Sequence, residues 1–273
     1  MKQLLALAVL LCTMNGLHAQ GWLPSGARSM SMSNASVGLY DVWSYHNNPG
    51  ALAKIDRLSA GLAYENRFLL RELQSQGITF AIPLKVGVIS IGGLSYGYSQ
   101  FRSTKAGVGY SMPLSDRFYA GVQLNYQGIQ LSQNYGNANT VTAEAGIFAE
   151  VTENWNLGVS VFNLSRTRLS EFQDDRLTTV MRLGTAYTFS EKLLVSAEFE
   201  KSIEYDLRFK SGLEYQIISD FYFRGGVATA PVEFSFGTGY DFGAIQLDLG
   251  TAYDMILGWS PHFSLTYQAK KKK

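Results

Sequence analysis

The stretch Leu207-Arg-Phe-Lys-Ser-Gly-Leu-Glu-Tyr-Gln-Ile217 decides the fold class of this chain. Its apolar side chains occupy alternate positions, with arginine, lysine, glutamate and glutamine between them. Because successive side chains of a β-strand point to opposite faces, this period of two predicts a strand with one apolar and one polar face. About fourteen such segments, each of roughly ten residues, follow one another from Leu58 onward. The clearest of the others are 119–128, 193–201, 232–241 and 245–253.

Two architectures accommodate so many alternating strands, a soluble β-sandwich and a transmembrane barrel. The connections after even-numbered strands are tight, as at 114–117 and 190–191, whereas the longer connections 68–76, 132–140 and 164–177 follow odd-numbered strands. Short turns at one rim and longer loops at the other are typical of outer-membrane barrels. Aromatic residues beside the tight turns would form a girdle at the membrane interface. They are Phe118, Tyr119, Trp155, Phe189, Phe221, Tyr222, Phe223, Tyr240 and Phe242.

We therefore predict an all-β fold, a transmembrane, antiparallel, up-and-down β-barrel of about 14 strands over residues 58–269. Only 16% of the residues are charged and 46% are hydrophobic, which excludes a disordered protein. Past the first residues, no apolar run reaches the roughly 18 positions of a membrane helix. An even strand count places both chain ends on the short-turn side. This is the periplasmic side of the outer membrane of a Gram-negative bacterium.

The first nineteen residues have the pattern of a signal peptide. Met1-Lys2 is a basic start, an apolar stretch follows, and Leu17-His18-Ala19 is a cleavage context. The single cysteine, Cys12, lies inside 1–19, so the mature chain has neither disulfides nor thiolate metal ligands. Once Lys2 and the basic tail 270–273 are set aside, 18 basic residues face 22 acidic ones. This mildly acidic body excludes nucleic acid as a partner, and we interpret 270–273 as a solvated periplasmic tail.

Charged positions within the strands are predicted to face the lumen. A basic side chain facing hydrocarbon would cost about 2–4 kcal/mol, which an inward orientation avoids. The lumen is then either a polar conduit or a space closed by ion pairs and filled by another segment. Charges of both signs, and the residues 20–57 ahead of the first strand, favour the second reading. The lumenal charges are Glu144, Glu198, Glu200, Arg208, Lys210, Glu214, Arg224 and Asp248.

Residues 20–57 carry the most informative motif. Gly26-Ala-Arg-Ser-Met-Ser-Met-Ser-Asn-Ala-Ser-Val-Gly38 leads to Asp41 and then to Asn48-Pro-Gly-Ala-Leu-Ala53. Small residues dominate it, with Gly and Pro where a chain packed in a tight space must bend. The motif resembles the N-terminal signature of PorV/PorQ-type outer-membrane barrels of type IX secretion, distant relatives of the long-chain fatty acid porins. The residues that carry the motif are Gly26, Ala27, Arg28, Asp41, Asn48, Pro49 and Gly50.

The match to this family has two departures. Gly50-Ala51 reverses the usual order, and Asp41 stands alone where the family often has two acids. The resemblance implies that 20–57 folds into the lumen as a plug, with Arg28 near the lumenal acids. Glycines of the segment 86–98, namely Gly92, Gly93 and Gly97, would permit close approach of such a plug or would serve barrel curvature.

Signals of an enzyme are nearly absent. Neither His46 nor His262 stands beside a nucleophile, no metal-ligand spacing occurs, and nothing indicates a cofactor. We predict a non-enzymatic accessory or scaffolding subunit of an envelope secretion or assembly complex, in contact with outer-membrane lipid and other envelope proteins. The alternative is a transporter like the fatty acid porins, which moves a hydrophobic small molecule across the outer membrane. A non-specific small pore is a third possibility.

Overall fold

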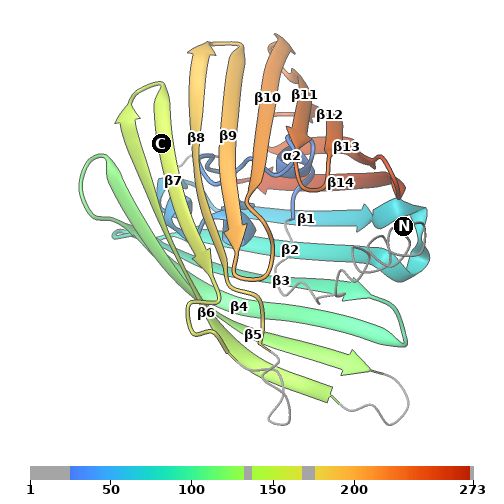
Figure 1. Cartoon of the computed structure of the whole chain (residues 1–273). Coiled ribbons are helices and arrows are strands. Elements are labelled where there is room, and N and C mark those ends of the chain that lie inside the picture. Colours follow the sequence, from blue (N-terminus) through green and yellow to red (C-terminus); the bar gives the residue numbers. More distant parts are fainter. Residues whose placement is uncertain (1–24, 132–136, 168–175, 271–273) are drawn as a thin grey trace, which may run out of the picture.

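Fourteen antiparallel strands close into a barrel in which each strand pairs with its sequence neighbours and β1 pairs with β14 (Figure 1). The computed structural model describes residues 25–131, 137–167 and 176–270. The predicted all-β, up-and-down barrel is confirmed. The predicted signal peptide 1–19 and most of the tail 270–273 lie outside the described residues. Among the described residues, no helix is long and apolar enough to cross a membrane.

The strands are 8 to 16 residues long. They are β1 (Ser59–Asn66), β2 (Gln74–Pro83), β3 (Val88–Gly97), β4 (Phe101–Pro113), β5 (Phe118–Leu131), β6 (Asn137–Thr152), β7 (Trp155–Phe162), β8 (Val180–Ser190), β9 (Leu193–Ser202), β10 (Arg208–Ile218), β11 (Phe221–Ala228), β12 (Glu233–Asp241), β13 (Ile245–Asp254) and β14 (Gly258–Gln268). Short helices are α2 (Ala27–Met30), α3 (Ser44–Asn47), η1 (Pro49–Lys54), η2 (Arg67–Leu69) and η3 (Arg71–Leu73).

The alternation read from the sequence sets the two faces of the wall. In β10, Leu213 and Tyr215 are 37% and 42% exposed on the outside, while Glu214 between them is 9% exposed and faces the lumen. The outer faces of the other strands are likewise apolar, with exposed residues such as Leu62 and Val122. An apolar exterior of this kind is what a hydrocarbon environment requires.

The two rims differ as predicted. Tight connections such as Glu191-Lys192 and Ser219-Asp220 lie at one rim, where Ser59 of β1 pairs with Gln268 of β14. Both ends of the barrel wall therefore lie at this short-turn rim. The opposite, long-loop rim carries the longer connections, and that between β7 and β8 extends beyond the predicted 164–177 because β8 begins only at Val180.

The predicted aromatic girdle is wrong at two positions. Tyr119 and Tyr222 face the lumen, where the Tyr119 hydroxyl donates to Glu150 Oε2 at 2.8 Å and the Tyr222 hydroxyl lies 3.2 Å from Gln216 Nε2. Each follows an aromatic neighbour, Phe118 or Phe221, that faces outward. One step along a strand reverses the face, so nearness to a turn does not by itself place a ring at the membrane.

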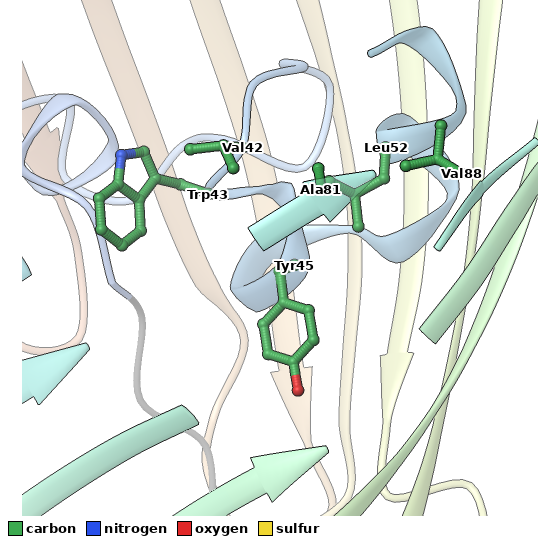
Figure 2. Packing of buried hydrophobic residues seen from close by; sticks show 6 residues of the cluster. All are labelled: Val42, Trp43, Tyr45, Leu52, Ala81 and Val88. Atoms are coloured by element: carbon green, nitrogen blue, oxygen red, sulfur yellow. The ribbon is translucent and has the colours of Figure 1, made fainter. Parts of the chain in front are cut away.

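The buried apolar core of the molecule lies inside the barrel, around residues 25–57. Figure 1 shows this N-terminal segment, with α2, enclosed by the strands. Val42, Trp43, Tyr45 and Leu52 of the segment form one cluster with Ala81 of β2 and Val88 of β3 (Figure 2). The cluster packs the segment against one side of the wall, and polar contacts fix it to the others.

Candidate functional site

The lumen and the N-terminal segment inside it form the candidate site. An ionic network joins the segment to the wall through Arg28. Arg28 Nε and Nη2 donate to the two Glu214 carboxylate oxygens at 2.8 Å each, and Nη1 donates to Asp41 at 3.1 Å. Arg224 Nε donates to Glu214 at 2.6 Å and Arg224 Nη1 to Asp248 at 2.7 Å. The planar guanidinium holds Glu214 with two parallel bonds, a geometry that fixes orientation as well as charge.

The charge of Arg28 is secured by its partners. Burial alone would lower the pKa of Arg28, but the carboxylates of Glu214 and Asp41 outweigh it and raise that pKa well above the ordinary value. The chain Asp41–Arg28–Glu214–Arg224–Asp248 alternates in sign along its length. Alternating charges satisfy one another, so this network ties the segment to β10, β11 and β13 with little excess charge.

A second anchor holds the backbone of the segment. Glu198 of β9 accepts hydrogen bonds from the backbone amides of Ser36 and Val37 at 2.9 and 2.8 Å. Its other carboxylate oxygen lies 3.2 Å from Lys210 Nζ, which also contacts Glu200 at 2.6 Å. A buried carboxylate needs such donors to compensate for its lost hydration. Glu198, Glu200 and Lys210 thus meet at the point where the segment turns.

A third cluster lies on the side of β4 to β6. Lys105 of β4 pairs with Glu144 of β6, whose carboxylate also accepts from Asn125 Nδ2 at 2.6 Å. The Tyr45 hydroxyl of α3 lies 3.1 Å from both Asn125 Oδ1 and the Gly92 carbonyl oxygen. Buried Lys105 and Asn125 were not singled out from the sequence. Their inward positions in alternating strands were the available signal.

The predicted motif residues lie at the bends of the segment. Asn48 Oδ1 accepts from the Gly50 amide at 3.0 Å and its Nδ2 donates to the carbonyl oxygens of Val37 and Ile147 at 2.8 and 3.1 Å, which anchors the turn before Pro49. Side chains of Asn, Asp and Ser favour such turns because they bond to nearby backbone groups.

Gly26 and Ala27 lie at the other end of the segment. Gly26 adopts φ of 100°, which favours glycine, and a side chain there would overlap the Trp43 ring. The Ala27 amide donates to Ser264 Oγ of β14 at 3.1 Å, and Trp43 Nε1 donates to Thr266 Oγ1 of the same strand at 3.1 Å. This end of the segment is therefore fastened to the last strand of the barrel.

Glycines of the wall allow backbone to lie against backbone. A methyl group at Gly158 of β7 would overlap the Val37 carbonyl oxygen, and one at Gly121 of β5 would overlap that of Pro49. For the glycines in 86–98, close approach of the segment and barrel curvature were both considered. Gly92 faces the Tyr45 ring of the segment, whereas Gly93 faces outward. Close approach is thus the role of the inward glycines.

Other charged residues lie nearer the ends of the lumen. Lys54 Nζ contacts Glu150 at 2.8 Å, a pair not included among the predicted site residues. Burial of Lys54 alone would lower its pKa, but Glu150 outweighs this and raises it. Arg208 lies at the long-loop end, 3.7 Å from Glu233. Within the described residues, no group of His, Cys, Asp or Glu is arranged to hold a metal ion.

Two cavities lie beside the segment. One of about 170 Å³ is lined by Arg28, Tyr40, Asp41 and Lys54 among others, near the short-turn rim. The second, of about 200 Å³ and near the long-loop rim, is lined by charged residues that include Glu233. Both contain ionic side chains of both signs, which would lose hydration without compensation beside an apolar ligand.

A closed barrel with an apolar outer wall and a polar, ion-paired interior defines the class of outer-membrane β-barrels. The chain belongs to the PorP/SprF family of type IX secretion system membrane proteins, whose model matches residues 77–272. The predicted outer-membrane location and the association with type IX secretion are thereby confirmed at the level of the family.

Solved structures share the fold at low sequence identity. The CymD monoaromatic hydrocarbon channel has a TM-score of 0.70 at 11% identity, covering 92% of this chain and 99% of that chain. The Ralstonia pickettii toluene transporter TbuX has a TM-score of 0.66 at 13% identity, with the same coverage of 92% and 99%. A Pseudomonas aeruginosa FadL homologue has 0.65 at 12%, covering 93% and 100%. No curated protein matches the chain.

Proposed function

We propose that this barrel is a non-enzymatic accessory or scaffolding subunit of an envelope secretion complex, with residues 20–57 acting as a plug. The observation that carries this proposal is the attachment of the segment to the wall. Glu198 receives two of its backbone amides and Glu214 receives Arg28. A segment held by buried charges is costly to move, since separating such a pair leaves a charge unpaired. A barrel whose lumen is filled in this way suits a structural subunit better than a conduit.

The finer assignment, to PorV/PorQ-type barrels, rests on the motif from Gly26 to Ala53. This assignment would determine which components of the secretion machinery the subunit contacts. We further propose that both chain ends lie in the periplasm, with 1–19 removed on export. This is supported by the pairing of Ser59 with Gln268 at the short-turn rim, because such barrels have short periplasmic turns.

The test is purification from native outer membranes in mild detergent, with mass spectrometry of every protein that remains bound. We expect recovery in a defined large complex with other secretion components. Planar-bilayer recordings of the same preparation should show no steady conductance. A stable monomer that conducts ions would contradict both the scaffold and the plug.

The second candidate is transport of a hydrophobic small molecule. It is favoured by the solved structures of similar fold, which are named as a monoaromatic hydrocarbon channel and a toluene transporter. The charged cavities weigh against it, because an apolar ligand gains little beside Arg28 and Asp41. Organic extraction of the purified barrel, followed by mass spectrometry, distinguishes the two. A specific apolar ligand at one copy per barrel would favour transport.

A further inference from the structure

One half of the long-loop rim exposes a group of aliphatic side chains, beside the exposed charged residues Arg71, Glu72, Glu204 and Asp206. Exposed aliphatic side chains lie at the tips between β9 and β10, β11 and β12, β13 and β14, and β1 and β2. Ile256 is 90% exposed and Met255 is 66% exposed. We call these residues the apolar half-rim: Leu69, Leu70, Ile203, Leu207, Val232, Met255, Ile256 and Leu257. The tips of β13–β14 and β1–β2 are adjacent, since the Phe68 amide donates to Ser260 Oγ at 3.1 Å.

The other half of the same rim is different. In its described part, between β3 and β8, the tips expose Ser99, Gln100 and Arg166. Leu131 and Leu164 are its exposed aliphatic residues there, at 40% and 51%. Among the described residues, eight exposed aliphatic side chains lie on one half of the rim and two on the other, and apolar patches on a surface mark interaction sites.

Membrane lipid does not account for this patch. Outward aromatic pairs, Tyr253 with Trp259 and Phe199 with Phe209, lie on the strands below the tips, with ring centroids 4.7 and 5.2 Å apart. Such aromatic residues mark the level of the lipid headgroups. Met255 follows Tyr253 and continues away from the membrane, so the apolar half-rim extends past the girdle into the aqueous side.

A charged cavity lies directly behind the apolar half-rim. The cavity of about 200 Å³ is lined by residues of the same strands and tips, including Phe68, Pro231 and Leu257. It contains four carboxylates against three basic side chains. Glu233 is held loosely, with Arg208 Nη2 at 3.7 Å, and 23% of its side chain is exposed. Asp254 already accepts from the backbone amides of Ile256 and Leu257 at 2.8 Å each, so the acceptor capacity for a further cation lies at Glu233.

We propose that the apolar half-rim and this cavity together form the docking surface for another protein subunit. The partner lays an apolar surface on the tips and places a lysine or arginine side chain beside Glu233. Charge complementarity selects the cation, and burial of the tips supplies the driving force. This inference rests on the proposed function, since it assigns the face by which the barrel joins its complex.

The first test compares two leucines of similar exposure. Leu257→Asp places a charge in the patch, and Leu164→Asp places the same charge on the other half of the rim. We expect Leu257→Asp to reduce the partner recovered in native purification at least tenfold, with Leu164→Asp unchanged. The heat-dependent shift of the barrel on gels verifies folding of both variants. If the wild-type complex forms and Leu257→Asp leaves it intact, the docking surface is wrong while the subunit function stands.

A wild-type barrel without any bound protein would instead contradict the proposed function itself. The second test uses a photo-crosslinking amino acid at position 256 and, as control, at position 100. We expect position 256 alone to crosslink to the protein identified in the native complex. Adducts with lipid only would overturn the proposal in favour of membrane insertion.

The third test concerns the cavity. Glu233→Lys reverses the charge that receives the partner's cation, and Asp241→Lys makes the same reversal at the opposite end of β12. We expect at least a tenfold loss of partner for Glu233→Lys and no loss for Asp241→Lys. Equal retention in both variants would show that the cavity takes no part in docking.

Discussion

The inner and outer surfaces of the barrel wall are made by the same strands but obey different rules. On β10, Leu213 faces outward among other apolar residues, and its neighbour Glu214 faces inward between Arg28 and Arg224. The outer residue needs only the right chemical type, because lipid accepts any apolar side chain. The inner residue needs particular partners at particular distances, because a buried charge without them is costly.

The strongest test of this difference between the two surfaces adds the same side chain to each of them. Gly158 of β7 faces the Val37 carbonyl oxygen, whereas a side chain at Gly225 of β11 would have as its nearest neighbour the Ser235 carbonyl oxygen at 3.9 Å. Gly158→Val forces a side chain against the Val37 backbone, and we expect a loss of about 3 kcal/mol in the free energy of unfolding. Gly225→Val should change it by less than about 1 kcal/mol. Urea titration in lipid vesicles measures both.

Protease accessibility of residues 25–57 adds a second readout. In Gly158→Val the segment should become cleavable while the barrel still resists digestion. Equal stability of the two variants would mean that the segment does not press against the inner wall.

The outer surface is tested by placing an arginine at two different depths in the membrane. Leu213→Arg places a cation in the middle of β10, and Ile218→Arg places one at the end of that strand, at the short-turn rim. We expect costs of about 2–4 kcal/mol and about 0–1 kcal/mol respectively, because hydrocarbon surrounds only the first. The same vesicle titration measures both. Similar costs at both depths would contradict a lipid-facing wall.

The inner surface is tested by removing one partner. Arg28→Gln leaves Glu214 and Asp41 without their shared cation, and we expect a loss of about 2–3 kcal/mol, reduced from the fully buried case because Arg28 is partly exposed. Arg57→Gln breaks the exposed pair with Asp56 and should cost less than about 1 kcal/mol.

A double variant, Arg28→Gln with Glu214→Gln, separates pairing from packing. It should recover part of the loss, because the Glu214 carboxylate, which lost Arg28 in the single variant, is then no longer present as a charge. No recovery in this cycle would mean that Arg28 acts through packing alone.

The sequence predicts the outer surface better than the inner one, for a physical reason. Alternation placed most strand ends within a residue or so, as in Leu207 against Arg208 for the start of β10. It was wrong at the long-loop rim, where β5 continues to Leu131 and β6 begins at Asn137, inside the predicted connection 132–140. The aromatic girdle was predicted from nearness to the turns and not from alternation, and for this reason Tyr119 and Tyr222 were assigned to the wrong face. Which acid receives Arg28 was not predictable, since Glu214 lies 186 positions away. The contact between Arg28 and Glu214 depends on the path of the segment through the lumen, which local sequence patterns do not reveal.

Alternation also identified lumenal acids and bases as a class without pairing them. Glu198 illustrates the limit, because its partners are backbone amides of Ser36 and Val37. Backbone donors carry no signature in sequence. The residues of the apolar half-rim are likewise far apart in sequence, since the tips that carry Leu69 and Ile256 become adjacent only when β1 pairs with β14.

The last test concerns the lumen itself, through a residue that stays neutral among charges and whose effect appears only as the pH falls. His46 of α3 lies between the Trp43 and Tyr45 rings, with centroids 6.3 and 4.8 Å away. Burial, and next the charge of Lys105, lower the pKa of His46 from 6.5 to about 3. Between these values the unfolded chain takes up a proton that the folded chain does not. The contribution of His46 to stability is therefore complete above pH 6.5 and is lost as the pH falls towards 3.

The measurement is the difference in unfolding free energy between the wild type and His46→Asn, followed from pH 7.5 to pH 4.5. The slope attributable to His46 should approach about 1.4 kcal/mol per pH unit below pH 6. Other titrating groups, Glu214 included, are common to both proteins and largely cancel in the difference. A difference that does not change with pH would mean that His46 is protonated or hydrated in the folded barrel. The lumen around His46 would then be hydrated, and the inner surface would be closer to a conduit than to a core.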